Sequence, residues 1–191
     1  MARPQRLKNK PRKVRALGAV MSLLDPRTYV HLMKMLHYYN YSHASQLRKM
    51  KVGSNVRIAP TVSLTNAEHI TLGDNVELSE FSTVWASADG GRITIEDWAG
   101  IGPYCFVTAA KYDNSATRIE ERPEPVGAGI RIGRGARIYA NCMIMAGTSI
   151  GEGAIVGPGS LVNSDIPPYA IAMGSPARVV LQRRPPSTES D

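Results

Sequence analysis

Two titratable side chains, Lys111 and Asp113, stand at the start of a long polar stretch. The stretch spans residues 113–131 and also carries Arg118 and Arg122. An aspartate, or a lysine whose pKa is depressed, could take a proton from an acceptor group, whereas arginines bind phosphate through paired donors. These residue types indicate either proton transfer or anion binding. The elements that hold the stretch decide how the side chains are presented.

Those elements follow a six-residue period. A spacing of six suits neither a helix nor a single strand, but it suits a short strand plus a turn, so three units would close one triangular coil. Most units also have a small residue at the fifth place, where a corner leaves little room. The pattern predicts stacked parallel coils with the leading residues pointing inward. The fifteen leaders are Val52, Ile58, Leu64, Leu72, Leu78, Val84, Ile95, Ile101, Val107, Ile132, Ile138, Ile144, Ile150, Val156 and Val162.

The units Leu72–Glu77 and Ile150–Ile155 resemble those of the hexapeptide-repeat, left-handed parallel β-helix family. The resemblance covers about residues 52–180 and implies an all-β, left-handed parallel β-helix of about five coils. The later stretch Gly174–Ala177, followed by basic residues, is similar to the ending of hexapeptide acyltransferases. As a whole the chain resembles bacterial sugar O-acetyltransferases of the maltose, galactoside and surface-polysaccharide kind.

The 191 residues suit one domain with attached segments. We expect a basic arm with an amphipathic helix over 1–51, the β-helix over 52–180 and a disordered tail over 181–191. The helix should run from Pro26 to Tyr41, begin at an Asp25 cap and pack on the base of the prism. Interruptions of the repeat are expected at 70–71, 90–94 and 113–131, the last being an inserted loop suited to a binding arm.

The positive charge is concentrated at one end of the chain. Residues 1–51 hold 12 Lys or Arg and one acid, Asp25, whereas the remaining residues are net acidic. The run Arg3–Arg15 contains seven basic residues and no acid. Three interpretations stay open for it: a solvated tail, contact with an anionic membrane, and nucleic-acid binding, the last disfavoured because no binding module accompanies the run. The segment Leu17–Leu24 is too short to span a bilayer.

Cys105 and Cys142 both fall at the small fifth place of a unit. That position predicts packed, reduced thiols, which fits a cytoplasmic protein, with peripheral attachment to the inner membrane as a further hypothesis. The repeat region contains a single histidine, His69. Metal-binding enzymes of this fold use three histidine ligands for one metal ion. A single histidine cannot supply such a site, so we expect no catalytic metal. The other histidines, His31, His37 and His43, are expected to be packing or surface residues.

The resemblance implies acetyl transfer from acetyl-CoA to a sugar hydroxyl or amine, in surface polysaccharide or lipopolysaccharide synthesis. It also implies a homotrimer with its sites between subunits. Small residues along the later coils would accept the pantetheine arm, and two arginines would face the CoA phosphates. Carried over to this chain, the expected cofactor-binding residues are Ala140, Asn141, Ala146, Gly147, Gly157, Pro158, Arg178 and Arg183.

The chain departs from the family pattern at two places. In similar O-acetyltransferases the catalytic base is a histidine in a Thr-x-x-His-x-x-Asp-like stretch. Here the stretch Thr108–Asp113 has Lys111 at the histidine position. Tyr139 stands where the family usually has glycine. Tyr112, Arg118 and Arg122 are the expected substrate contacts beside Lys111.

Three hypotheses remain for the chemistry. In the first, Lys111 or Asp113 is the base, helped by partial burial of Lys111 at a fifth place. In the second, the acceptor is an amine that needs no dedicated base, and Lys111, Arg118 and Arg122 bind its phosphates. In the third, the chain is an inactive scaffold or regulatory protein. His69 should lie two coils from Lys111, about 10 Å away, too far to share a proton within one subunit.

Overall fold

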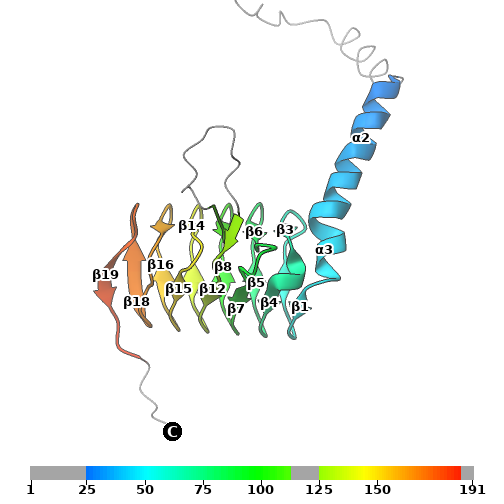
Figure 1. Cartoon of the computed structure of the whole chain (residues 1–191). Coiled ribbons are helices and arrows are strands. Elements are labelled where there is room, and N and C mark those ends of the chain that lie inside the picture. The colour runs from blue at the N-terminus through cyan, green and yellow to red at the C-terminus, as the bar shows by residue number, and fades with distance from the viewer. Residues whose placement is uncertain (1–24, 113–124, 186–191) are drawn as a thin grey trace, which may run out of the picture. The chain divides into compact units, whose positions relative to one another are not determined.

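The computed structural model describes residues 25–112 and 125–185, and it separates into two units, 1–40 and 41–191. The second unit is a left-handed parallel β-solenoid of about five turns (Figure 1). The six-residue period predicts the stacked coils, and the family resemblance implies their left hand. Its coils stack along one axis, and each side of the triangular cross-section is one parallel sheet. The basic arm over 1–24, the residues 113–124 and the tail over 186–191 lie outside the described residues.

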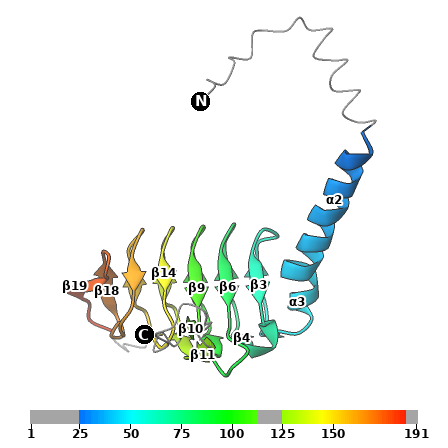
Figure 2. The ribbon, with the colours of Figure 1, turned by 45° about the horizontal axis from the view of Figure 1, so that its top comes forward.

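Three sheets form the sides of the prism, and Figure 2 shows one of them face-on. The sheet that opens each coil contains β1 (Lys51–Val52), β4 (Ile70–Leu72), β7 (Ile93–Ile95), β12 (Ile130–Ile132) and β15 (Ser149–Ile150). We call it side A. Side B contains β2 (Arg57–Ile58), β5 (Glu77–Leu78), β8 (Gly100–Ile101), β13 (Arg137–Ile138), β16 (Ile155–Val156), β18 (Ala170–Met173) and β19 (Arg178–Gln182). Side C contains β3 (Ser63–Thr65), β6 (Thr83–Trp85), β9 (Phe106–Thr108), β14 (Met143–Ile144) and β17 (Leu161–Val162).

The leading aliphatic residues fill the axis of the prism. Thirteen of the fifteen leaders are at most 3% exposed, and the two exceptions, Val52 and Ile58, belong to the first coil. Small residues at the fifth place are buried beside them, including Ala99, Ala136 and Ala154. Leaders of successive coils stand in register, so that Leu72, Ile95, Ile132 and Ile150 form one column. The inward orientation predicted for the leaders is therefore confirmed from the second coil on.

The interruptions begin and end a few residues earlier than the sequence indicated. Each lies between side C and side A, over 66–69, 86–92 and 109–129. The expected limits were wrong because Ile70, Ile93 and Ile130, which precede the leaders by two residues, also point inward and belong to the strands. All three interruptions consequently stack at a single corner, the C–A corner. It carries η2 (Ala67–His69) and the antiparallel pair β10 (Ala110–Tyr112) and β11 (Pro125–Gly127).

The helix α2 (Pro26–Tyr39) belongs to the first unit. Its start is as predicted, because the Asp25 side chain accepts from the Arg27 backbone N–H at 2.9 Å and proline occupies the first turn. None of its residues is buried within its own unit. The packing of this helix on the prism stays a prediction.

The segment that follows α2 does pack on the first coil. It consists of η1 (Asn40–Ala44), a π-helical turn, and α3 (Ser45–Leu47). The buried His43 ring places Nδ1 2.7 Å from the Val62 carbonyl oxygen, and the buried Gln46 amide oxygen accepts from the Ala67 N–H at 3.3 Å. These polar groups cover the first coil at side C and the C–A corner, whereas Val52 on side A stays 46% exposed.

The other end closes by a change of strand direction. β18 continues side B in parallel, and β19 then returns antiparallel to it. The Arg183 guanidinium donates to the carbonyl oxygens of Gly153 and Tyr169, which joins the returning chain to the last turns. Beyond β18 no further coil is added in the part of side B that the structure describes.

A core leader and its outward neighbour provide a direct test of the stacking. Leu72 is 2% exposed and Thr71, beside it on β4, points to solvent. We expect Leu72→Ala to lower the free energy of unfolding by about 2–5 kcal/mol, because it leaves a cavity in the axis, whereas Thr71→Ala should change it by less than about 1 kcal/mol. Urea denaturation followed by circular dichroism measures both values. Equal losses in the two variants would contradict an axis held by the leaders.

Candidate functional site

A groove of about 380 Å³ runs across side B of the solenoid. Its floor is β8, where Gly100 and Gly102 occupy the two outward positions around the inward Ile101. A Cβ at Gly102 would come within 2.9 Å of the Ile138 carbonyl oxygen, and a Cβ at Gly100 within 2.5 Å of an Arg137 guanidinium nitrogen. The coil therefore needs glycine at position 102, where backbone is close, whereas at position 100 only the movable Arg137 side chain is near. The two missing side chains create the hollow.

Polar and aromatic side chains from the neighbouring coils line this groove. Glu77 and Ser79 come from the coil before β8, and Arg137 and Tyr139 come from the coil after it. Glu77 forms an ion pair with Arg57 at 3.0 Å, while the Arg137 guanidinium lies over Gly100. The groove thus offers charged groups of both signs and a half-exposed tyrosine, a composition suited to a polar organic ligand.

Four of the predicted cofactor-binding residues lie at the edge of this groove. Ala140 lines the groove, and Asn141 follows it at the corner between sides B and C. Gly157 and Pro158 occupy the equivalent place one coil further, where the Gly159 N–H donates to the Ala140 carbonyl at 2.9 Å. Asn141 and Pro158 are exposed on consecutive coils, whereas Gly157 between them is buried.

Arg178 lies near the same edge. It pairs with Met173 across the β18–β19 turn, and a Cβ at Gly157 would lie 3.0 Å from the Met173 Cβ. Its side chain is exposed and donates to its neighbour's carbonyl, that of Ala177, at 2.9 Å. Arg183 differs, because its guanidinium is engaged by the carbonyls of Gly153 and Tyr169 at another corner.

The predicted residues Ala146 and Gly147 lie at the C–A corner, with the interruptions. Gly147 has a φ of 80° and donates its N–H to the Gly129 carbonyl at 3.1 Å, directly behind the β10–β11 pair. The strand β14 separates them from Asn141. The cofactor residues predicted from the sequence therefore divide between two edges of side C.

Hydrogen bonds at the C–A corner fix the start of β10. The Thr108 hydroxyl accepts from the Ala110 N–H at 3.2 Å, and the Ala109 N–H donates to the Trp85 carbonyl at 2.9 Å. Gly91 and Gly127 also approach closely, since a Cβ at Gly127 would lie 2.2 Å from the Gly91 nitrogen. The arm therefore leaves the solenoid in a defined direction.

Lys111 lies in the middle of β10, where it pairs with Val126. The expected partial burial of Lys111 is wrong, because its side chain is exposed: the chain leaves the solenoid after Thr108, so the apparent fifth place lies on the outgoing arm. Tyr112 ends the same strand, whereas Asp113, Arg118 and Arg122 lie outside the described residues. His69 stands at the same corner, two coils away, as the register predicts.

Three exposed aromatic residues at the corners were not anticipated. Phe81 and Tyr104 stack with ring centroids 5.2 Å apart at the corner that holds Asn141, and Trp98 stands at the other end of β8. All three have φ near 60°, a region where Asn or Gly is usual and a bulky side chain is strained. In the sequence, the groove could have been inferred from the two glycines, 100 and 102, that flank the leader Ile101. The exposed aromatic residues near it could have been inferred from their place at turn positions.

Among the described residues no three His, Cys, Asp or Glu side chains gather as metal ligands, and no helix is long and apolar enough to cross a membrane.

Sequence comparison places the repeat in a known family. Residues 129–164 match the family described as bacterial transferase hexapeptide (six repeats). This match shows a hexapeptide repeat in the later coils of the chain. A search of curated proteins finds no match to it. The relationship expected from the units at 72 and 150 is thus confirmed by the family match and by the solenoid itself.

Several solved structures share the fold of this chain. A hexapeptide-repeat acetyltransferase from Vibrio cholerae is 26% identical with a TM-score of 0.65, covering 73% of this chain and 78% of that one. Another structure of that protein contains acetyl-CoA. A galactoside acetyltransferase in complex with coenzyme A is 26% identical with a TM-score of 0.64, covering 82% and 81%. A maltose O-acetyltransferase from Clostridium difficile is 25% identical with a TM-score of 0.63, covering 73% of each chain.

Two buried thiols lie beneath the groove. Cys105 and Cys142 are free, at most 2% exposed, and donate to the carbonyls of Tyr139 and Gly157 at 3.0 and 3.1 Å. Hydrogen bonding with the Cys142 thiol, followed by burial, raises the pKa of Cys105. The predicted packing of both thiols is confirmed, and neither faces the groove as a nucleophile.

We expect these thiols to resist Ellman's reagent in the folded protein at neutral pH, because burial prevents access and the raised pKa of Cys105 disfavours its thiolate. Unfolding in guanidinium should release both of them to the reagent, which serves as the internal control. Absorbance of the released thiolate measures the reaction. Rapid labelling of the native chain would contradict the packed arrangement.

Proposed function

We propose that this protein is an acetyl-CoA-dependent acetyltransferase acting on a sugar hydroxyl or amine. The observation that carries the proposal is the groove on side B, which continues past Ala140 to the exposed residues Asn141 and Pro158, on the fold of hexapeptide acetyltransferases. Related structures at about a quarter identity contain acetyl-CoA or coenzyme A. An extended pantetheine arm suits a shallow edge with small side chains.

In the proposed reaction the acceptor oxygen or nitrogen attacks the thioester carbonyl. The new C–O or C–N bond forms as the C–S bond breaks, and CoA leaves as a thiol after gaining the acceptor's proton. The acceptor sugar would occupy the groove between Ser79 and Tyr139, and a role in surface polysaccharide synthesis is the process we propose for it.

The exposure of Lys111 in the single chain supports an anion-binding role over a role as the base. A lysine base depends on burial or a nearby cation to lose its proton, and burial is not present at this position. We therefore propose that Lys111 binds an anionic part of the acceptor, together with Arg118 and Arg122, and that the acceptor amine or hydroxyl loses its proton without a histidine. Asp113 remains the alternative base within the same arm.

A second copy of the chain completes the proposed site. The groove lies on side B, whereas the arm carrying Lys111 leaves from the C–A corner, on the opposite side of the same prism. Within one chain the two cannot face a common substrate. A cyclic homotrimer, in which each arm reaches the neighbour's groove, is the arrangement we propose.

Acetyl-CoA binding tests the cofactor assignment. We expect micromolar affinity by isothermal titration calorimetry, and a loss of about tenfold in Arg178→Ala, because a charge-assisted hydrogen bond to phosphate is removed. Arg184→Ala is the matched control, since Arg184 is also exposed and lies beyond β19. The absence of binding at millimolar acetyl-CoA would reject the enzyme and favour a scaffold of the same fold.

The role of Lys111 is tested by replacing it with alanine and with arginine. If Lys111 contacts an acceptor anion, Lys111→Ala should raise the KM for the acceptor about tenfold or more, and Lys111→Arg should restore most of it, because arginine keeps the charge. Steady-state kinetics on a sugar acceptor separates KM from kcat. A kcat lost equally in both variants, with KM unchanged, would instead identify Lys111 as the base, since arginine cannot accept the proton.

A further inference from the structure

The helix α2 presents large apolar side chains over most of its circumference. Its exposed residues include Leu32, Met33, Met35 and Leu36, each between 58% and 61% exposed. A helix with so much exposed apolar surface is stable in water only when something covers it. The proposed acyl transfer makes no use of this helix, so its apolar surface must serve a separate role.

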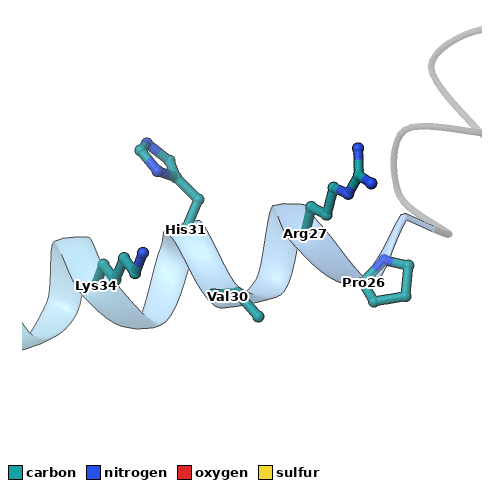
Figure 3. A pocket seen from close by; sticks show the side chains of 5 residues that line it. All are labelled: Pro26, Arg27, Val30, His31 and Lys34. Carbon is teal, nitrogen blue, oxygen red and sulfur yellow. The ribbon is translucent and has the colours of Figure 1, made fainter.

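The apolar and basic residues of α2 occupy different faces. At 100° per residue, Leu32, Met33 and Leu36 lie within one face. Arg27, His31 and Lys34, spaced by four and three residues, lie on the opposite face, where Figure 3 shows their side chains leaving the ribbon. This division into an apolar and a basic face is typical of helices that lie in a membrane interface.

The charge around the helix selects among possible partners. Residues 1–51 carry 12 basic residues against one acid, and that acid, Asp25, is engaged as the helix cap. A second copy of this helix would bring the same positive charge with it. An anionic lipid surface supplies the opposite charge, and each Lys or Arg near such a surface contributes about 1 kcal/mol.

The helix is too short to cross a bilayer. Fourteen residues at about 1.5 Å each give roughly 21 Å, against about 30 Å of hydrocarbon. A helix of this length can lie flat, with its apolar face at the boundary of headgroups and acyl chains. The basic run Arg3–Arg15 precedes it in the sequence and adds attraction to the same surface.

We propose that α2 is an interfacial helix that attaches this protein to an anionic membrane. Leu32, Met33 and Leu36 enter the boundary of the acyl chains, and the basic residues of the first 51 positions draw the helix to the lipid headgroups. Neither element suffices alone, since apolar burial of a few side chains is weak and the charges are screened at ionic strengths near those of cells. The attachment is independent of the acyl-transfer proposal.

Flotation of the full chain with lipid vesicles tests the attachment. One set of vesicles is phosphatidylcholine alone, and the other contains equal amounts of phosphatidylcholine and phosphatidylglycerol. At about 0.1 M salt the chain should float with the anionic vesicles only, and raising the salt to about 1 M should release most of it, because the Debye length falls from about 10 Å to about 3 Å.

Two variants distinguish binding through the apolar face from non-specific adsorption to the vesicles. Leu32→Gln with Leu36→Gln keeps the charge and a good helix former, and should reduce the floated fraction about tenfold. Val30→Gln, which lies outside the apolar face, is the matched control and should float like the parent. Circular dichroism of all three chains checks that the solenoid is intact.

Three results would overturn the proposal. The first is a parent chain that does not float with anionic vesicles, and the second is a double variant that floats as well as the parent. The third is a double variant that elutes as a smaller assembly than the parent, which would show that a second copy covers this face. Acetyl-CoA affinity, measured on the same variants, keeps a failure here distinct from a failure of the proposed enzyme.

Discussion

Backbone hydrogen bonds between stacked coils are the constraint on which this structure depends. Gly73 donates to the Ile95 carbonyl, and Gly133 to the Ile150 carbonyl, at 2.8 and 2.7 Å, and comparable bonds recur on all three sides. Since no coil can bury its apolar side alone, every coil must keep the register of its neighbours. Any extra residues can then leave only at a corner, and in this chain all three interruptions leave at the same one. The position of the arm carrying Lys111 follows from that restriction.

The repeat made the scaffold predictable, because few architectures besides a stack of short strands and turns place an aliphatic residue at every sixth position. The burial of Leu78, Ile101 and Ile144, and of the two thiols, followed from the period alone. The limits of the interruptions did not, because inward residues such as Ile93 precede the leaders and were counted as part of the loops. The error for Lys111 has the same origin: a numerical fifth place has no structural meaning once the chain has left the coil.

The groove illustrates a different limit of sequence reasoning. Gly100 and Gly102 are ordinary residues for a turn-rich repeat, and only the pairing of β8 with β5 and β13 shows that their missing side chains lie between Ser79 and Tyr139. Such a surface depends on residues about twenty to forty positions apart. Likewise the aromatic pair Phe81 and Tyr104 becomes visible only when successive coils are placed in register. The motif identified the fold, and the stacking created the site.

The ends of the solenoid have a consequence for assembly. A stack of parallel coils exposes unpaired strand edges at both ends, and such edges invite another copy to continue the stack into a fibre. Here the returning strand β19, fixed by Arg183, occupies the side B edge at one end, while His43 and Gln46 cover part of the first coil at the other. At the end that carries β19, another copy therefore cannot continue the parallel stack on side B.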